Sequence, residues 1–146
     1  MFKFRLETVL NARKAFEDKL LREFSEKKRE LEKEKQVLET LKEERQQSID
    51  HLKSMSAQAV NVAEIGMYTS YIEFLQGRVD HQQMVVSKGR EALEAKRQEV
   101  LEAIMKRKIM ENLKEREYRE YQANIELQER KALDEISLQG FSRRML

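Results

Sequence analysis

The feature that most limits the fold is the near absence of turn-forming residues. In 146 residues the chain has no proline and only four glycines, although these residues supply many of the tight turns in proteins. Sandwiches, barrels and doubly wound sheets need a turn roughly every 8–12 residues, so these folds are excluded. Charged residues make up 38% of the chain, as is typical of long exposed helices. The sequence therefore predicts an all-α protein.

The charged side chains divide the chain into three parts. Residues 1–53 contain 26 of them, residues 54–72 contain one, Glu64, and residues 73–146 contain the other 29. Asn61 and Glu64 have the spacing of a capping box at a helix start, and Gly140 is typical of a helix stop. We predict one domain over 1–146, with a helix over about 4–57, a turn over 58–66, a helix over about 67–138 and a flexible tail over 139–146.

Both predicted helices carry a heptad stripe. That of the second has one clean apolar row, made of Ile72, Val79, Val86, Leu93 and Val100, and drifts after Val100. That of the first is broken. Nine of its 15 seam positions are apolar, whereas others hold charged residues such as Glu17, Glu34 and Arg45. Charges at seam positions disfavour a long homodimer, and a short joint closes at little entropic cost. We therefore predict a rod-shaped, monomeric, antiparallel coiled-coil hairpin. A turn near residues 61–62 places Met55 near Tyr68, Leu52 near Ile72 or Tyr71, Leu31 near Leu93 and Leu10 near Leu113.

The sequence contains no recognisable motif for catalysis, metal binding or phosphate binding. There is no cysteine, the two histidines form no ligand pair, and the glycines form no phosphate loop. No apolar stretch reaches the roughly 18 residues of a membrane span, and the first ten residues do not form a secretory signal. The net charge of +2 comes from finely mixed charges, which disfavours nucleic-acid binding. We predict no catalytic, cofactor-binding or metal-binding residues, no enzyme activity and a cytoplasmic location.

Two groups of residues are unusual on a coiled coil. The second helix opens with apolar and aromatic residues next to its seam, which predicts a partner surface or, alternatively, a cap that closes the hairpin around Met55. The chain ends combine cations with apolar residues, although Phe2 and Phe4 have an alternative use, packing on the second helix between 113 and 121. The first group is Tyr71, Phe74, Leu75 and Arg78, of which Leu75 also falls on the seam, and the second is Phe4, Arg5, Leu6, Arg13, Lys14, Arg143 and Arg144.

Three segments in order resemble the flagellar export protein family called FliJ, and the resemblance covers essentially the whole chain. The segments are Phe4-Arg5-Leu6-Glu7-Thr8-Val9-Leu10 followed by Arg13-Lys14 and Glu17-Asp18, then Tyr71-Ile72-x-x-Leu75-x-x-x-Val79-x-x-Gln82, and last Lys131-x-Leu133-Asp134-Glu135. The family's central stripe is generally aromatic, then Leu, then small or variable, and Arg78 departs from this pattern.

The resemblance implies a non-catalytic component of the bacterial flagellar type III export apparatus. Such a protein looks like the central stalk of a rotary ATPase. Its implied partners are the hexameric export ATPase FliI, whose assembly and ATP hydrolysis it promotes, the export gate protein FlhA, and export chaperones. The implied location is the cytoplasm, peripherally at the inner face of the cell membrane at the flagellar base. On this basis the terminal group is expected to contact the ring, and Tyr71, Phe74, Leu75 and Arg78 the gate or chaperones.

Two alternatives remain at this point. One is a structural coiled-coil scaffold without an ATPase partner. The other is the equivalent stalk of a virulence-type injectisome, which composition does not distinguish from a flagellar one.

Overall fold

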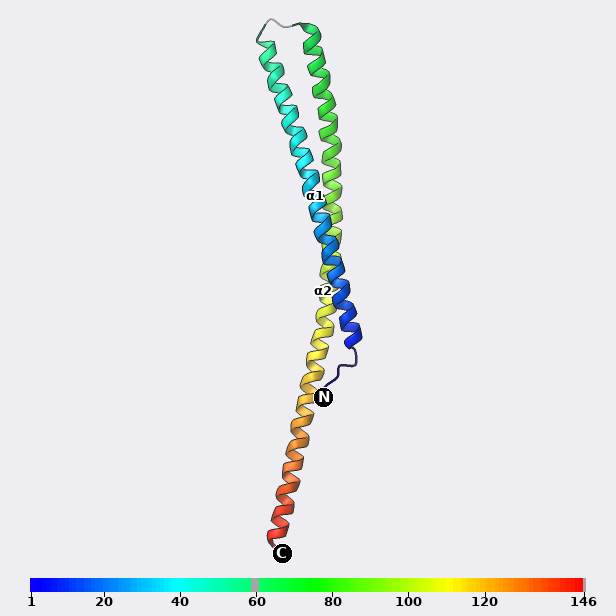
Figure 1. Ribbon diagram of the computed structural model, residues 1–146, viewed down its shortest axis with the longest axis vertical. Coiled ribbons are helices and arrows are strands. Elements are labelled where there is room, and N and C mark those ends of the chain that lie inside the picture. Colours follow the sequence, from blue (N-terminus) through cyan, green and yellow to red (C-terminus); the bar gives the residue numbers. More distant parts are fainter. Residues whose placement is uncertain (59–60, 146) are drawn as a thin grey trace. The chain divides into compact units, whose positions relative to one another are not determined.

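The computed structural model describes residues 1–58 and 61–145, and over this part of the chain it contains two helices and no strand (Figure 1). Helix α1 spans Glu7–Ser56 and helix α2 spans Val62–Met145. They run in opposite directions and pack against each other, so the prediction of an all-α antiparallel hairpin is confirmed. Residues 59 and 60 of the predicted turn and residue 146 of the predicted tail lie outside the described residues.

The helix ends follow local rules. Asn61 precedes α2, and its side-chain oxygen accepts a hydrogen bond from the Ala63 N–H at 3.1 Å, as an N-cap residue does. The Asn61 half of the predicted capping box is thus confirmed. Glu64 in the first turn and Arg143 in the last turn of α2 complement the helix dipole.

Helix α2 extends beyond the predicted range at both ends, from Val62 through residues 139–145 of the predicted tail. Gly140 does not stop it, and its backbone has no positive φ. A glycine costs a helix only about 1 kcal/mol relative to alanine, and no proline follows to end the helix.

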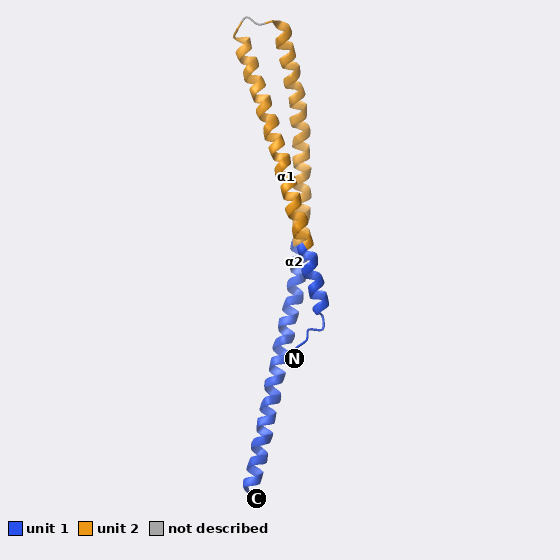
Figure 2. Ribbon diagram, viewed as in Figure 1, with its two compact units in different colours: residues 1–18, 101–146 blue, residues 19–100 orange. Residues whose placement is uncertain are grey.

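The chain forms two compact units, shown in different colours in Figure 2. Unit 1 comprises residues 1–18 and 101–146, and unit 2 comprises residues 19–100. Each unit contains a segment of α1 and an antiparallel segment of α2. The core of unit 2 is a cluster of aliphatic side chains from both helices, namely Leu31, Leu38, Leu41, Leu75, Val79 and Val86, with Leu93 packed against it. In unit 1 the buried apolar residues are Phe4, Leu10 and Ala103.

Polar seam positions of unit 2 bond across the helix pair. Gln82 is buried and donates hydrogen bonds from Nε2 to the main-chain oxygen of Glu34, at 2.9 Å, and to the Glu34 carboxylate. Arg45 donates to Gln76 Oε1 at 2.7 Å. Two breaks in the predicted stripe, Glu34 and Arg45, are therefore positions where a polar residue finds a partner on the other helix.

A further polar contact across the helix pair of unit 2 is the ion pair of Lys96 and Glu23, in which Lys96 Nζ and Glu23 Oε2 are 2.8 Å apart. The hydrogen bond to Glu23, followed by a second to Glu99, raises the pKa of Lys96. The same bond from Lys96 lowers the pKa of the Glu23 carboxyl.

Unit 1 has two such bridges. Arg107 donates from Nε to the buried carboxylate of Glu17 and from Nη1 to Glu111, at 2.8 Å. The bond to Glu17, followed by that to Glu111, raises the pKa of Arg107. Lys114 pairs with Glu7 at 2.9 Å.

The register of unit 2 follows the predicted one with a local shift. Leu93 packs against the cluster that contains Leu31, as predicted. The Leu31 side chain, however, lies against Gly89, where an added Cβ would be 3.0 Å from Leu31 Cδ1. Because glycine has no side chain, Leu31 occupies the space one helical turn earlier on α2.

Candidate protein-binding surfaces

The N-terminal residues of the predicted ring surface divide into inward and outward side chains in unit 1. Phe4 is buried and Leu6 is half-buried, so they serve packing rather than contact with a partner. Arg5 and Lys14 are exposed, and Arg13 is half-buried. Only the cations of this group are therefore available to a partner.

Phe2 explains why the apolar residues of this segment turn inward. Its ring packs edge-on against Tyr118, with centroids 5.2 Å apart, and lies 5.5 Å from Tyr121. These contacts hold residues 1–6, which precede α1, on helix α2. The alternative interpretation of the N-terminal aromatic residues, packing between 113 and 121, is confirmed.

Arg143 and Arg144 are exposed in the last turn of α2. They lie about 33 Å farther along the helix than Tyr121, at about 1.5 Å per residue. The structure thus does not bring them together with Arg5 and Lys14, and the predicted terminal surface consists of two separate groups.

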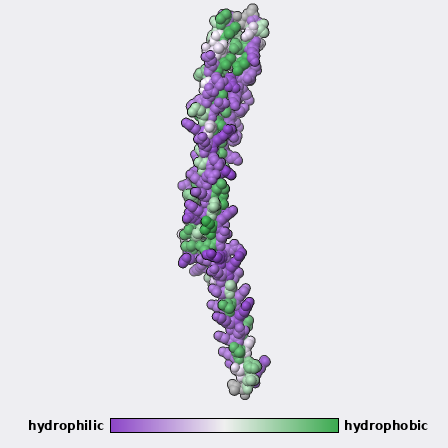
Figure 3. Space-filling model, turned by 180° about the vertical axis from the view of Figure 1, so that it is seen from behind, coloured by the Kyte–Doolittle hydropathy of each residue, from purple (hydrophilic) through white to green (hydrophobic). Residues whose placement is uncertain are grey.

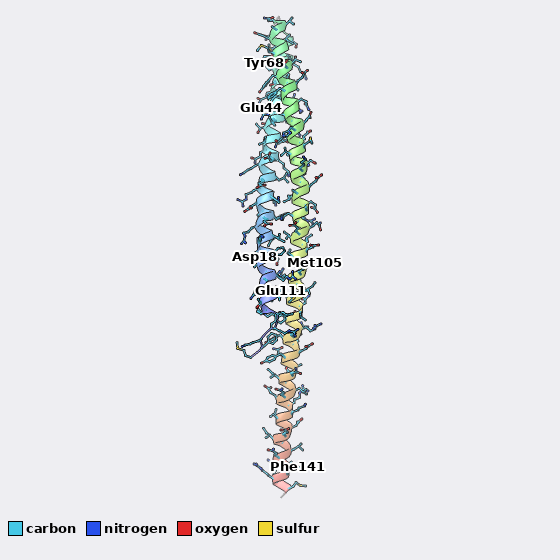
Figure 4. All side chains as sticks on the ribbon, turned by 90° about the vertical axis from the view of Figure 1, so that its right-hand side faces the viewer. Asp18, Glu44, Tyr68, Met105, Glu111 and Phe141 are labelled. Atoms are coloured by element: carbon cyan, nitrogen blue, oxygen red, sulfur yellow. The ribbon has the colours of Figure 1, made fainter. Side chains whose placement is uncertain are left out.

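Sequence reasoning missed an apolar surface on the α2 segment of unit 1 that follows Tyr121. Phe141, labelled in Figure 4, lies on this segment, and residues 126–145 are all exposed. Leu138, Phe141 and Met145 share one helix face through their i, i+3, i+7 spacing, while Leu133 and Ile136 lie on another. The same spacing is visible in the sequence, but the predicted helix ends at residue 138, which assigns Phe141 and Met145 to the tail and separates them from Leu138.

The predicted stripe in unit 2 is exposed except at one position. The rings of Tyr71 and Phe74 stack with centroids 6.4 Å apart, and the Arg78 guanidinium lies 5.8 Å from the centre of the Phe74 ring. Tyr71 and Phe74 are 45% and 58% exposed, whereas Leu75 is 1% exposed and belongs to the core. The assignment of Leu75 to a contact surface is corrected, because its side chain faces α1.

A hollow of about 400 Å³ lies beside this stripe, between the two helices of unit 2. Its α1 side includes Val37, which is an exposed apolar residue next to the seam residue Leu38. Val37 was not predicted, although an off-seam apolar residue in a charged helix is a usable signal. The α2 side of the hollow contains Phe74, Gly77, Arg78 and His81.

Within residues 1–58 and 61–145, no group of three His, Cys, Asp or Glu side chains could hold a metal ion. Neither helix, over its described length, contains a stretch long and apolar enough to cross a membrane.

Comparison with known proteins identifies a family. A family model described as "Flagellar FliJ protein" matches residues 2–146, essentially the whole chain. No curated protein and no solved structure matches it.

Proposed function

Since the chain belongs to the FliJ family of flagellar proteins and is thereby a flagellar export-related protein, we propose that it is the non-catalytic coiled-coil stalk of the export ATPase. In this role it binds the hexameric FliI ring, promotes ring assembly and ATP hydrolysis, and links the ring to the export gate protein FlhA and to export chaperones. Its place is in the cytoplasm, at the inner face of the membrane at the flagellar base.

The observation that carries this proposal is the exposed α2 segment of unit 1 after Tyr121. Its apolar side chains lie on more than one face of the helix, and Arg143 and Arg144 follow in the last turn. A helix with apolar side chains on several faces is suited to be enclosed by protein on several sides. A ring of ATPase subunits encloses a helix in this way.

The cations of unit 1 give this contact its polar part. Arg143 and Arg144 are exposed next to Phe141 and Met145, and arginine and aromatic residues are enriched among interface anchors. Arg5, Arg13 and Lys14 form a second group of cations for the ring, while Phe4 and Leu6 support it from within the unit.

Unit 2 supplies a different contact surface, which we assign to FlhA or an export chaperone. Tyr71, Phe74 and Arg78 are exposed beside the hollow that Val37 borders. Aromatic side chains next to a hollow can anchor a partner because they bury a large area at a small entropic cost.

The proposed mechanism needs no catalytic group on the stalk. A single helix inside a near-sixfold ring contacts the subunits unequally. If it binds one subunit conformation better than another, it shifts their populations by that difference in affinity. The stalk thereby favours the subunit states through which ATP hydrolysis proceeds.

The test is ATP hydrolysis by the purified export ATPase from the same source, titrated with this protein. We expect a rise that saturates near one stalk per six ATPase subunits. The double variant Arg143→Glu/Arg144→Glu should lose most of the stimulation, whereas Lys106→Glu/Lys108→Glu, two exposed cations elsewhere on α2, should retain it. No stimulation by the unmodified protein at any ratio would contradict the proposal.

The gate assignment is tested by binding of the purified FlhA cytoplasmic part to the immobilised chain. Tyr71→Ala/Phe74→Ala should weaken binding at least about tenfold, as expected when two anchors are lost. Met84→Ala removes an exposed apolar side chain from the same unit and should leave binding unchanged. Unchanged binding in the first variant would remove this surface from the assignment.

A further inference from the structure

The seam of unit 2 is open at the end nearest the helix connection. Farther from the connection, the α2 seam residues Leu75, Val79 and Val86 are buried. Nearer to it, seam residues from both helices are only half-buried, and the helices draw apart toward the connection (Figure 1). The half-buried residues are Leu52, Met55, Ile65, Tyr68 and Ile72.

A hollow of about 800 Å³ lies at this open end, within the size range of ligand pockets. Hydrophobic surface also gathers at this end of unit 2 on the face seen in Figure 3. We call the hollow the tip cleft. Its lining residues are His51, Met55 and Gln58 from the α1 side and Glu64, Met67, Tyr68 and Tyr71 from α2.

The lining combines adaptable apolar groups with a single carboxylate. Met55 and Met67 contribute flexible thioethers, which adjust to differently shaped side chains. The Tyr68 ring, labelled in Figure 4, packs against His51 with centroids 4.9 Å apart. Glu64 is exposed and takes part in none of the ion pairs of the described residues.

The charge of this region distinguishes between kinds of partner. Residues 54–77 contain no Lys or Arg, and their charged residues are Glu64 and Glu73. Lys53, exposed in the last turn of α1, is the one Lys or Arg directly before this range. A surface on which acidic groups outnumber cations has little electrostatic attraction to anionic lipids, so a membrane is disfavoured. A partner with a cation beside its apolar residues is complementary to the cleft, since Glu64 attracts the cation and the Tyr68 ring can also receive it.

We propose that the tip cleft binds an amphipathic helix of a partner protein, with its apolar side chains between Met55 and Met67 and a Lys or Arg beside Glu64. A third helix in this position covers the half-buried seam residues of both α1 and α2. The site is additional to the ring and gate contacts and does not depend on them, although Tyr71 borders both the cleft and the gate surface.

The probe is a fluorescein-labelled 14-residue amphipathic peptide of Leu and Lys, titrated with the full chain and followed by fluorescence anisotropy. A matched peptide with Glu in place of Lys is the charge control. We expect micromolar binding of the Leu–Lys peptide and at least about tenfold weaker binding of the Leu–Glu peptide, as for complementary against like charge. Equal affinity for both peptides, or no binding of either, would overturn the proposal.

Three variants locate the binding site. Met55→Ala/Tyr68→Ala should weaken binding of the Leu–Lys peptide at least about tenfold. Glu64→Gln, at an exposed position in the first turn of α2, should reduce the difference between the two peptides by severalfold. Met84→Ala, an exposed methionine elsewhere on α2, should leave both affinities unchanged. Circular dichroism checks that every variant keeps its helix content.

Two results would count against the cleft as the peptide site. The first is an unchanged affinity in both Met55→Ala/Tyr68→Ala and Glu64→Gln. The second is binding of the chain to phosphatidylserine vesicles that is lost in Met55→Ala/Tyr68→Ala, which would assign the cleft to a lipid surface instead.

Discussion

Gln82 of α2 donates a hydrogen bond to the main-chain oxygen of Glu34 on α1, 2.9 Å away, although the Gln82 side chain lies in the apolar seam of unit 2. A polar side chain at such a position fixes the pairing of two helices at a cost in stability. Gln82→Leu should therefore leave the melting temperature unchanged or raise it by a few degrees, measured by circular dichroism. A fall of more than about 5 °C, which corresponds to a loss of more than about 1 kcal/mol, would show that Gln82 is net stabilising.

The glycines of α2 allow a matched comparison. A Cβ at Gly77 would have no neighbour within 4 Å, whereas a Cβ at Gly89 would lie 3.0 Å from Leu31 Cδ1. Gly77→Ala should raise the free energy of unfolding by about 0.5–1 kcal/mol. Gly89→Ala should gain less or lose stability, because Leu31 must move. Urea denaturation measures both, and an equal gain at the two positions would contradict the close contact of Leu31 with Gly89.

A second pair of substitutions distinguishes the exposed aromatic stripe from the core by the effect of each on stability. Leu75→Ala should lower the free energy of unfolding by about 2–5 kcal/mol, since it removes a fully buried side chain. Tyr71→Ala, at an exposed position, should change it by less than about 1 kcal/mol. Urea denaturation of the two variants gives the comparison. A similar loss in both would mean that Tyr71 also belongs to the core.

The Lys96–Glu23 bridge predicts how stability depends on pH. The lowered pKa of Glu23 gives stabilisation that is present above its usual value of 4.5 and is lost as the pH falls through the folded value. The raised pKa of Lys96 gives stabilisation that is present below 10.5 and is lost as the pH rises through the folded value. Lys96→Met should lower the melting temperature near neutral pH and weaken its fall at both extremes.

The control for this experiment is Lys88→Met, at an exposed position on the same helix. Melting curves between about pH 3 and pH 11 extend below the usual pKa of the Glu23 carboxyl and above that of Lys96. Identical pH profiles for Lys96→Met and the unmodified protein would rule out a contribution of this bridge to stability.

The cross-helix bridges also bear on the prediction of a monomer. Glu17, Glu34 and Arg45, which break the stripe of α1, all meet polar partners on α2 of the same chain. We therefore expect sedimentation equilibrium to give the mass of one chain, 17.5 kDa, over the micromolar range. A mass of two chains at the lowest concentrations would favour the scaffold alternative.

The sequence was sufficient for the parts of the fold that follow from periodicity. Val79, Val86 and Val100 were placed on the seam by their heptad spacing and are buried. The lack of proline predicted two long helices. The family resemblance, which rests on ordered short segments rather than on any single motif, agrees with the family match over residues 2–146.

Other features depend on contacts that periodicity does not contain. Leu31 lies against Gly89 because glycine has no side chain there, and the heptad pattern does not show this space. Leu75 lies on two possible stripes in the sequence, and only the packing of α1 shows that it faces inward. The surface of Leu138, Phe141 and Met145 was missed because Gly140 was given the role of a helix stop.

The cross-helix bridges also determine which misaligned pairings of α1 and α2 can form. A slip of one heptad toward the connection would move the buried Glu17 carboxylate from Arg107 to the level of Val100. A carboxylate buried without a partner costs several kcal/mol. A hairpin misaligned in this way is therefore much less stable than the native one. The bridges therefore restrict the two helices to a single alignment, at some cost in the stability of the seam.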